Sequence, residues 1–136
     1  MTTNTVIDRA RLSECLGYEL KSFVEANPKS RALYERAQKS LVGGVPMPWM
    51  MRWAGGFPVF AKIAVGAGII DVDAHTYIDF CLGDTGAMAG HALPAVADAL
   101  AAQARRGITT MLPSPDAAWV ADELAERGFK VGAVHG

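Results

Sequence analysis

The amino-acid sequence lacks most of the features that would place a protein in a functional class at first reading. It has only two cysteines in 136 residues, Cys15 and Cys81, and no C-x-x-C pattern, which favours buried free thiols in a reducing cytoplasm. Its formal net charge is −1 without a basic run, so nothing in it predicts a nucleic-acid partner. Charge, glycine or proline interrupts every apolar run well before the roughly 18 residues that a membrane span needs.

The N-terminus also lacks a basic start followed by an apolar block, so a secretory signal is not expected. We therefore expect a cytoplasmic protein that neither crosses a membrane nor binds nucleic acid. The length corresponds to one ordinary domain, and 51% hydrophobic with 20% charged residues is typical of a globular protein.

Helical periodicity marks both ends of the chain. Residues 8–26 place apolar side chains at spacings of four, four and three, and an Asn-Pro pair ends this helix. Ser30 is expected to cap a second helix, which Gly43 ends in the left-handed conformation. Two more helices are predicted over LPAVADALAAQARRG and DAAWVADELAER, the latter introduced by a Ser-Pro pair.

The middle of the chain changes character. Residues 43–56, GGVPMPWMMRWAGG, contain two prolines that favour an extended path. This segment is too apolar for an ordinary surface connection, so another part of the molecule or a partner chain should cover it. Three short runs rich in β-branched and aromatic residues follow, FPVFAKIAVGAG, IIDVDAH and TYIDFC. Turn residues separate them, so they predict an antiparallel three-stranded meander and an α+β arrangement.

The stretch IIDVDAHTYIDFCLGDTGAMAGHALPAV is crowded with side chains that could bind a metal or catalyse a reaction. An EF-hand loop counted from Asp71 lacks the residues required at its fifth, sixth and twelfth positions. A zinc site from His75, Cys81 and His91 would have spacings unlike those of known zinc sites. A Cys81–His91 nucleophile dyad shows no orienting group and no oxyanion pocket. We expect the aspartates to accept backbone N–H bonds at turns, which makes the stretch a scaffold with one exposed loop.

An ordered set of short elements runs from about Ser30 to Arg127. These elements are Gly43-Gly44-Val45, Gly56-Phe57-Pro58, the Asp-Val-Asp turn, Tyr77-Ile78-Asp79-Phe80, and Gly90-His91 followed by Pro94-Ala95-Val96. In combination they resemble the N-terminal part of class III pyridoxal-phosphate (PLP)-dependent aminotransferases. The most similar branches are the glutamate-1-semialdehyde aminomutase-like enzymes and the β-amino-acid aminotransferases.

The resemblance implies an α/β fold of fold type I and a homodimer. Residues 1–45 would form an N-terminal helical arm, and residues 46–113 the N-terminal share of the small domain, with the substrate loop, the meander and a helix. Residues 114–128 would be the first helix of the large PLP domain, which is otherwise missing. Residues 129–136 depart from the family pattern and read as a divergent or truncated tail.

The resemblance also implies PLP as the cofactor. In the family, the lysine that anchors PLP, a phosphate-binding loop and an aspartate facing the pyridine nitrogen all lie after the point where this sequence stops. The lysines present are in unrelated contexts: Lys21, Lys29, Lys39, Lys62 and Lys130. We therefore expect no catalytic and no cofactor-binding residue, and no metal ligand, in this chain.

For the part of the family that this sequence resembles, the resemblance implies residues that bind the substrate. In relatives, the loop after the Gly-Gly turn and the glycine-rich loop before Gly-His line the substrate pocket. Arg52 is the candidate to clamp a substrate carboxylate, for which its planar fork of donors is suited. Trp49 and Asp84 are the other candidate substrate-binding residues. The alternative for Arg52 is a surface arginine stacked on Trp49 or Trp53.

Two functions follow from these observations. The chain is either the N-terminal part of a PLP-dependent aminotransferase or aminomutase acting on an amino acid or amino aldehyde, or it is an inactive truncated remnant or an interaction module that pairs with a full-length homologue. The first would be an enzyme by family, although the 136 residues alone would be inactive. The second is suggested by the apolar loop and by the abrupt C-terminus.

Overall fold

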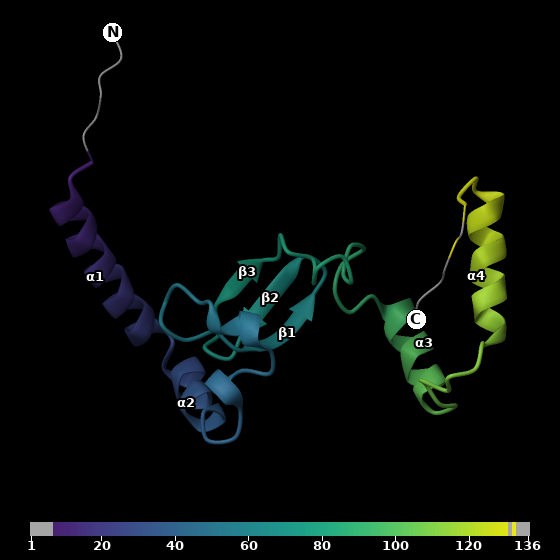
Figure 1. Ribbon diagram of the computed structural model, residues 1–136, viewed down its shortest axis with the longest axis horizontal. Coiled ribbons are helices and arrows are strands. Elements are labelled where there is room, and N and C mark those ends of the chain that lie inside the picture. Colours follow the sequence, from purple (N-terminus) through teal and green to yellow (C-terminus); the bar gives the residue numbers. More distant parts are fainter. Residues whose placement is uncertain (1–6, 131, 133–136) are drawn as a thin grey trace, which may run out of the picture. The chain divides into compact units, whose positions relative to one another are not determined.

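The computed structural model describes residues 7–130 and residue 132 (Figure 1). The elements in chain order are α1 (Arg9–Ala26), α2 (Pro28–Ala37), the short 3-10 helices η1 (Val42–Gly44) and η2 (Pro48–Met51), β1 (Ala61–Val65), β2 (Gly68–Asp71), β3 (Thr76–Ile78), α3 (Pro94–Ala104) and α4 (Pro115–Glu126). They form two compact units, Met1–Leu93 and Pro94–Gly136.

The three strands form an antiparallel sheet in the order β1-β2-β3, which confirms the predicted meander. A tight turn joins β1 to β2, so that Val65 pairs with Gly68. Gly66 in this turn has φ +57°, a conformation that glycine adopts without steric cost. The β1–β2 pairing has a register shift between Ala61 and Ile63, at the entrance to the sheet.

The first helix begins where the periodicity predicts, but the second does not. Asp8 caps α1, its carboxylate accepting the amides of Ala10 and Arg11 at 3.0 and 3.1 Å. The second helix begins at Pro28 and ends at Ala37, well before the predicted glycine. Ser30 is buried inside this helix and is not its cap, so that prediction is wrong. The amides at the start of α2 are instead bound by the carboxylate of Asp73, more than 40 residues further along the chain.

The first unit has a small hydrophobic core. Val45 and Phe57 are its buried apolar side chains among the described residues, and the Phe57 ring lies 4.9 Å from that of Phe23 on α1. Most of the predicted apolar helix faces are exposed, as are the two cysteines, Cys15 and Cys81. The prediction of buried thiols is therefore wrong: each lies on an apolar segment that this chain leaves uncovered.

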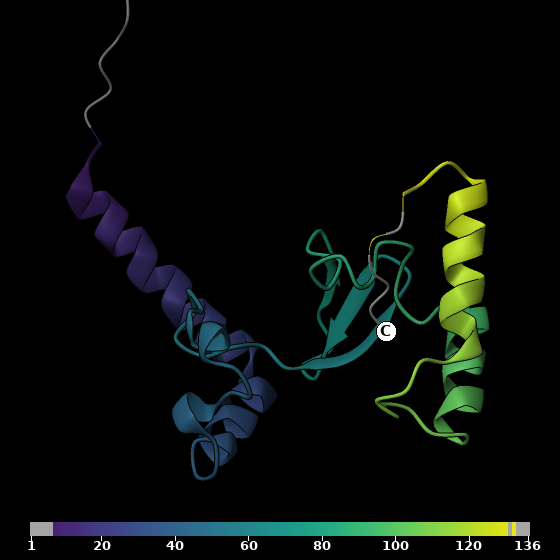
Figure 2. The ribbon, with the colours of Figure 1, turned by 45° about the vertical axis from the view of Figure 1, so that its right-hand side comes forward.

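The second unit consists of α3, α4 and the loop that joins them (Figure 2). Both helices were predicted from their periodicity, and α4 begins with proline at its first position, after Ser114. The predicted tail, residues 129–136, lies mostly outside the described residues. Among the described residues, no helix combines the length and the apolarity that crossing a bilayer requires.

Candidate functional site

The first predicted substrate loop, residues 43–56, forms two short 3-10 helices and not an extended path. Pro48 occupies the first position of η2, where its missing N–H removes no helical bond. Trp49 on η2 is 65% exposed, and its indole N–H donates to Sδ of Met47 at 3.3 Å. Arg52 follows η2, is exposed, and its amide donates to the Trp49 carbonyl at 3.2 Å. Two of the three predicted substrate residues therefore share one exposed turn.

The guanidinium of Arg52 has no partner among the described residues. Within residues 7–130 and 132 it has no carboxylate at ion-pair distance and donates no hydrogen bond. The alternative, stacking on Trp49 or Trp53, is not found in that part of the chain either. An unpaired guanidinium beside exposed indoles is suited to a ligand with a carboxylate and an apolar body.

Glycine is required where this loop leaves α2. Gly44 is buried and has φ +72°, and a Cβ at this position would lie 2.7 Å from Cε2 of Tyr34. The ring of Tyr34 in turn stacks on Phe57 with a centroid distance of 6.4 Å. The start of the loop is thus pressed against α2, while its tip remains exposed.

The aspartate at the end of β2 is a structural residue. Asp71 is fully buried, and its Oδ1 accepts the amides of Asp73 and His75 at 2.9 and 2.8 Å. Its Oδ2 accepts the Tyr77 hydroxyl at 2.9 Å and lies 3.0 Å from Nδ1 of His75. Burial alone raises the pKa of Asp71, but these hydrogen bonds outweigh it and hold the pKa below its ordinary value. Burial and the bond to Asp71 raise the pKa of Tyr77 to about 12.

The next aspartate caps a helix from a distance. Both carboxylate oxygens of Asp73 accept amides at the start of α2, from Lys29 at 2.8 Å and from Ser30 at 2.9 Å. The Ser30 hydroxyl accepts the Phe60 amide at 3.2 Å, so three hydrogen bonds join the start of α2 to Asp73 and Phe60. Burial raises the pKa of Asp73, and the two amide bonds more than offset it, so the net pKa is lowered. Asp71 accepts the amides of its own turn, as predicted, whereas the amides that Asp73 accepts belong to the start of α2.

A third aspartate holds the glycine-rich loop that follows β3. Oδ1 of Asp79 accepts the amides of Cys81 and Leu82 at 2.8 and 3.0 Å, and its Oδ2 lies 2.6 Å from Nε2 of His91. The bond with His91 is the main reason that the pKa of Asp79 is lowered. Asp84, the third predicted substrate residue, lies on this loop, is exposed, and has φ +53°.

The structure does not bring all three predicted residues together. In Figure 1 the short 3-10 helices of the first loop lie toward the end of the sheet where β1 begins, and the loop after β3 lies at the other end, by the β1–β2 turn. No hydrogen bond or ion pair joins Asp84 to Arg52 among the described residues. The sequence interpretation rejected a Cys81–His91 dyad, but it missed that His91 pairs with Asp79. The spacing of twelve between Asp79 and His91 on either side of a glycine-rich loop was the available signal.

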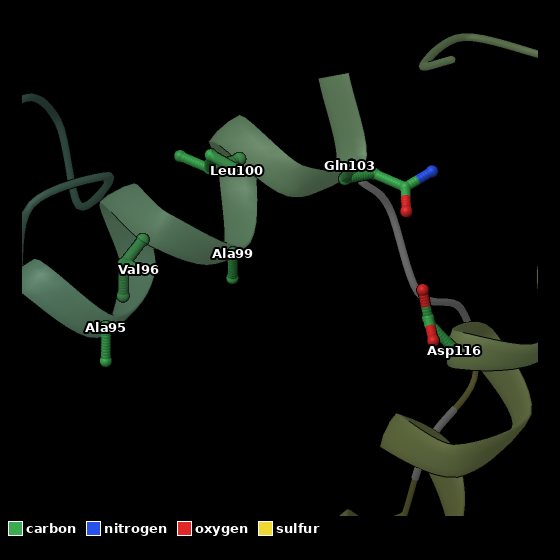
Figure 3. A pocket seen from close by; sticks show the side chains of 6 residues that line it. All are labelled: Ala95, Val96, Ala99, Leu100, Gln103 and Asp116. Carbon is green, nitrogen blue, oxygen red and sulfur yellow. The ribbon is translucent and has the colours of Figure 1, made fainter. Parts of the chain in front are cut away.

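The described residues do not fit an anchor for PLP. Their lysines are all exposed: Lys21, Lys29, Lys39, Lys62 and Lys130. A pocket of about 450 Å³ between α3 and α4 contains no cation to hold a phosphate (Figure 3). It is lined by Ala95, Val96, Ala99, Leu100, Gln103 and Asp116. The carboxylate of Asp116 would repel a phosphate, and no group of three metal-binding side chains occurs among the described residues.

Comparisons with known proteins connect this chain to a family, although no family model matches it. Over 91 residues, 66% of its length, it is 41% identical to the glutamate-1-semialdehyde 2,1-aminomutase of Chloroflexus aggregans. Over 89 residues it is 42% identical to the corresponding enzyme of Myxococcus xanthus. The alignments cover 21% and 20% of these proteins, so the chain spans about a fifth of the curated relatives it matches.

Solved structures agree with this relationship. A glutamate-1-semialdehyde-aminomutase from Pseudomonas aeruginosa PAO1 matches 89% of this chain with 48% identity and a TM-score of 0.79, and 27% of that protein is covered. A variant of it has been solved in complex with PMP. A β-phenylalanine aminotransferase from Variovorax paradoxus matches 85% of this chain with 26% identity and a TM-score of 0.72, over 26% of its own length. The chain therefore belongs to the class III PLP-dependent aminotransferase family, in its glutamate-1-semialdehyde-aminomutase-like branch, and corresponds to the N-terminal portion of these enzymes.

Proposed function

We propose that the chain is the N-terminal part of a PLP-dependent aminotransferase or aminomutase that acts on an amino acid or amino aldehyde in the cytoplasm. The single observation that carries this proposal is the 48% identity with the Pseudomonas aeruginosa aminomutase over 89% of this chain. In this proposal residues 1–45 are the arm, 46–113 belong to the small domain and 114–128 begin the large domain. The complete enzyme would be a homodimer.

Uncovered apolar surface supports the proposal. Around the first loop, Met47, Trp49, Met51 and Trp53 are all between 45% and 65% exposed. Apolar surface of this kind normally packs against other protein, because leaving it in water costs about 25 cal/mol for each Å². Further sequence of the same enzyme and its second subunit would supply that covering.

The role proposed for this chain is to bind and orient substrate. Arg52 would receive a substrate carboxylate in a two-pronged hydrogen bond, and Trp49 would contact the apolar part of the molecule. Asp84 would contribute a negative charge from the second loop, which suits a protonated amine. PLP, when bound, supplies the electron sink for amino-group transfer, and its anchoring residues would come from outside these 136 residues.

A chimaera tests the proposal. Residues 7–130 of this chain would replace the matching segment of the Pseudomonas aeruginosa enzyme. We expect the chimaera to retain PLP through dialysis and to transfer an amino group, because the replaced segment keeps the fold and leaves the cofactor anchor intact. A chimaera that retains PLP but has no transfer activity with any amino acid or amino aldehyde tested would contradict the proposal.

The isolated chain provides the complementary test. It should retain no PLP after dialysis, because the lysines are exposed and none of them lines the described pocket between α3 and α4, where an amine could be desolvated. Retained visible absorbance of lysine-bound PLP, lost on substitution of one lysine, would show that the chain has an anchor of its own.

The second candidate is an interaction module that pairs with a complete homologue as an inactive subunit. The exposed apolar face of α1, with Leu12 at 59% and Leu16 at 57% exposure, favours it. Size-exclusion chromatography of the chain mixed with the unmodified Pseudomonas aeruginosa enzyme tests this idea at micromolar concentrations. Co-elution would support it, and two independent peaks would exclude it.

A further inference from the structure

The loop between β3 and the His91 bridge adopts a backbone conformation that side chains resist. We call residues 80–90 the glycine loop. Within it Leu82, Gly83, Asp84 and Thr85 all have positive φ, between 53° and 80°. Three of these four consecutive residues carry a Cβ, and such residues seldom adopt this region. A conformation of this kind persists only when its surroundings hold it in place.

Packing does not hold the glycine loop. Phe80 is 89% exposed and Met88 is 72% exposed. The loop's internal backbone bonds close short turns, such as Asp84 to Cys81 at 3.2 Å and Ala87 to Leu82 at 2.8 Å. In the described part of the chain, its only side-chain hydrogen bonds are those to Asp79. Besides these backbone turns, the restraint on the glycine loop comes from its two ends.

One carboxylate connects those ends. Asp79 Oδ1 accepts the amides of Cys81 and Leu82, where the left-handed run begins, and Oδ2 meets the His91 ring, where the loop ends. The side chains of Asp79 and His91 are only 6% and 22% exposed, so water competes weakly for the contact. The His91 backbone is itself bound to Gly66 in both directions, at 2.8 and 2.9 Å. The Asp79 amide donates to Ala67 at 2.8 Å, which joins both partners to the β1–β2 turn.

We propose that Asp79 and His91 form a latch that positions the glycine loop, and with it Asp84, for substrate binding. The positioning role rests on the proposed function, in which this loop faces the substrate; the latch itself does not. Both are positioning residues that need not touch the substrate. An ionised Asp79 can only accept, so His91 donates through Nε2 in this contact, either as the neutral ring with its proton on Nε2 or as the imidazolium.

Amide hydrogen exchange in the 136-residue chain tests the latch directly. His91→Leu should raise the exchange rates of the Cys81 and Leu82 amides by about 10- to 100-fold, the factor expected for losing a hydrogen bond to a charged group. His91→Gln should restore protection, because its Nε2 can reach the same oxygen. Amides of Lys29 and Ser30, which bind a different carboxylate, should not change in any of these variants.

A matched control comes from the second histidine–aspartate pair. His75→Leu removes the ring that lies 3.0 Å from Asp71, in the same unit but at another turn. This variant should leave Cys81 and Leu82 protected. Equal deprotection in both leucine variants, or unprotected Cys81 and Leu82 amides in the unmodified chain, would overturn the latch.

The positioning role is tested separately in the chimaera. There His91→Leu should raise KM for the amino substrate by about 10-fold or more with little change in kcat, and His91→Gln should reverse the effect. If the His91→Leu chimaera has a normal KM although the amide hydrogens of its glycine loop exchange freely, the latch exists but does not position the substrate. An inactive parent chimaera would remove the proposed function and leave the exchange result standing.

Discussion

The helix cap provided by Asp73 yields the sharpest stability prediction. Its carboxylate accepts two amides at the start of α2, at 2.8 and 2.9 Å, across 44 and 43 residues of sequence. Asp8 caps α1 in the same way, because its carboxylate accepts two amides of the helix that directly follows it, at 3.0 and 3.1 Å. Comparing substitutions of Asp8 and Asp73 therefore separates two contributions to the unfolding free energy. One is that of a helix cap alone, and the other is that of a cap that also joins α2 to the meander.

The expected magnitudes follow from the bonds that each substitution removes. Asp8→Ala loses an exposed cap and should cost about 0.5–1 kcal/mol of unfolding free energy. Asp73→Ala loses two charge-assisted bonds in a half-buried site, each contributing about 1.5–3 kcal/mol before solvent takes over part of the loss. We expect a cost of about 2–4 kcal/mol for Asp73→Ala. Asp73→Asn keeps one acceptor oxygen but loses the charge, so its cost in unfolding free energy should lie between those of Asp8→Ala and Asp73→Ala.

Urea unfolding followed by tryptophan fluorescence measures the difference. A Trp119→Phe background removes the tryptophan of the second unit, so that the signal comes from Trp49 and Trp53 in the first. The linear slope with urea should be the same in all variants, so the midpoints report stability. If Asp73→Ala and Asp8→Ala lie within about 0.5 kcal/mol of each other, the cap does not join α2 to the meander.

Three further predictions follow from the same geometry. In the chimaera, Arg52→Gln should raise KM about 10- to 100-fold for substrates with a carboxylate and leave amines without one unaffected; an equal loss for both would remove the clamp. The pKa values of Asp71, Asp73 and Asp79 are lowered below 3.8 in the folded chain. The ionised carboxylates therefore stabilise the folded chain fully above that pH, and this contribution to the unfolding free energy is lost as the pH falls below it. Urea midpoints that stay constant down to about pH 3 would contradict this. The pKa of Tyr77 is raised to about 12, so an absorbance titration should show a tyrosine that ionises near that pH. Asp71→Asn should lower the pH at which this tyrosine ionises; identical curves for the two chains would refute the bond.

Local signals in the sequence predicted much of the fold. The β-branched runs and turn residues located the meander, and apolar spacing located four helices, because both depend on neighbours within a few residues. The start of α2 was misplaced, since its cap comes from Asp73, more than 40 residues away. Likewise, Pro48 does break an α-helix, but it also begins a 3-10 helix, which the extended-path interpretation overlooked.

Periodicity identifies the apolar face of a helix but not whether the chain contains anything to cover it. For that reason the predicted faces and the thiol of Cys81 are exposed in the structure. The candidate site shows the same limit. Trp49 and Arg52 were found because they sit in one short segment, whereas the pairing of Asp79 with His91 depends on how the glycine loop folds back to the β1–β2 turn.

We infer that these residues provide the substrate-binding side of an amino-transfer enzyme and that the residues anchoring its cofactor lie outside them. For the most direct test, the isolated chain and the chimaera are each incubated with PLP and the same amino donor. Amino-group transfer is then measured in both. We expect turnover by the chimaera, and by the isolated chain no turnover above that of free PLP. Turnover by the 136 residues alone, at a rate that one lysine substitution abolishes, would contradict it.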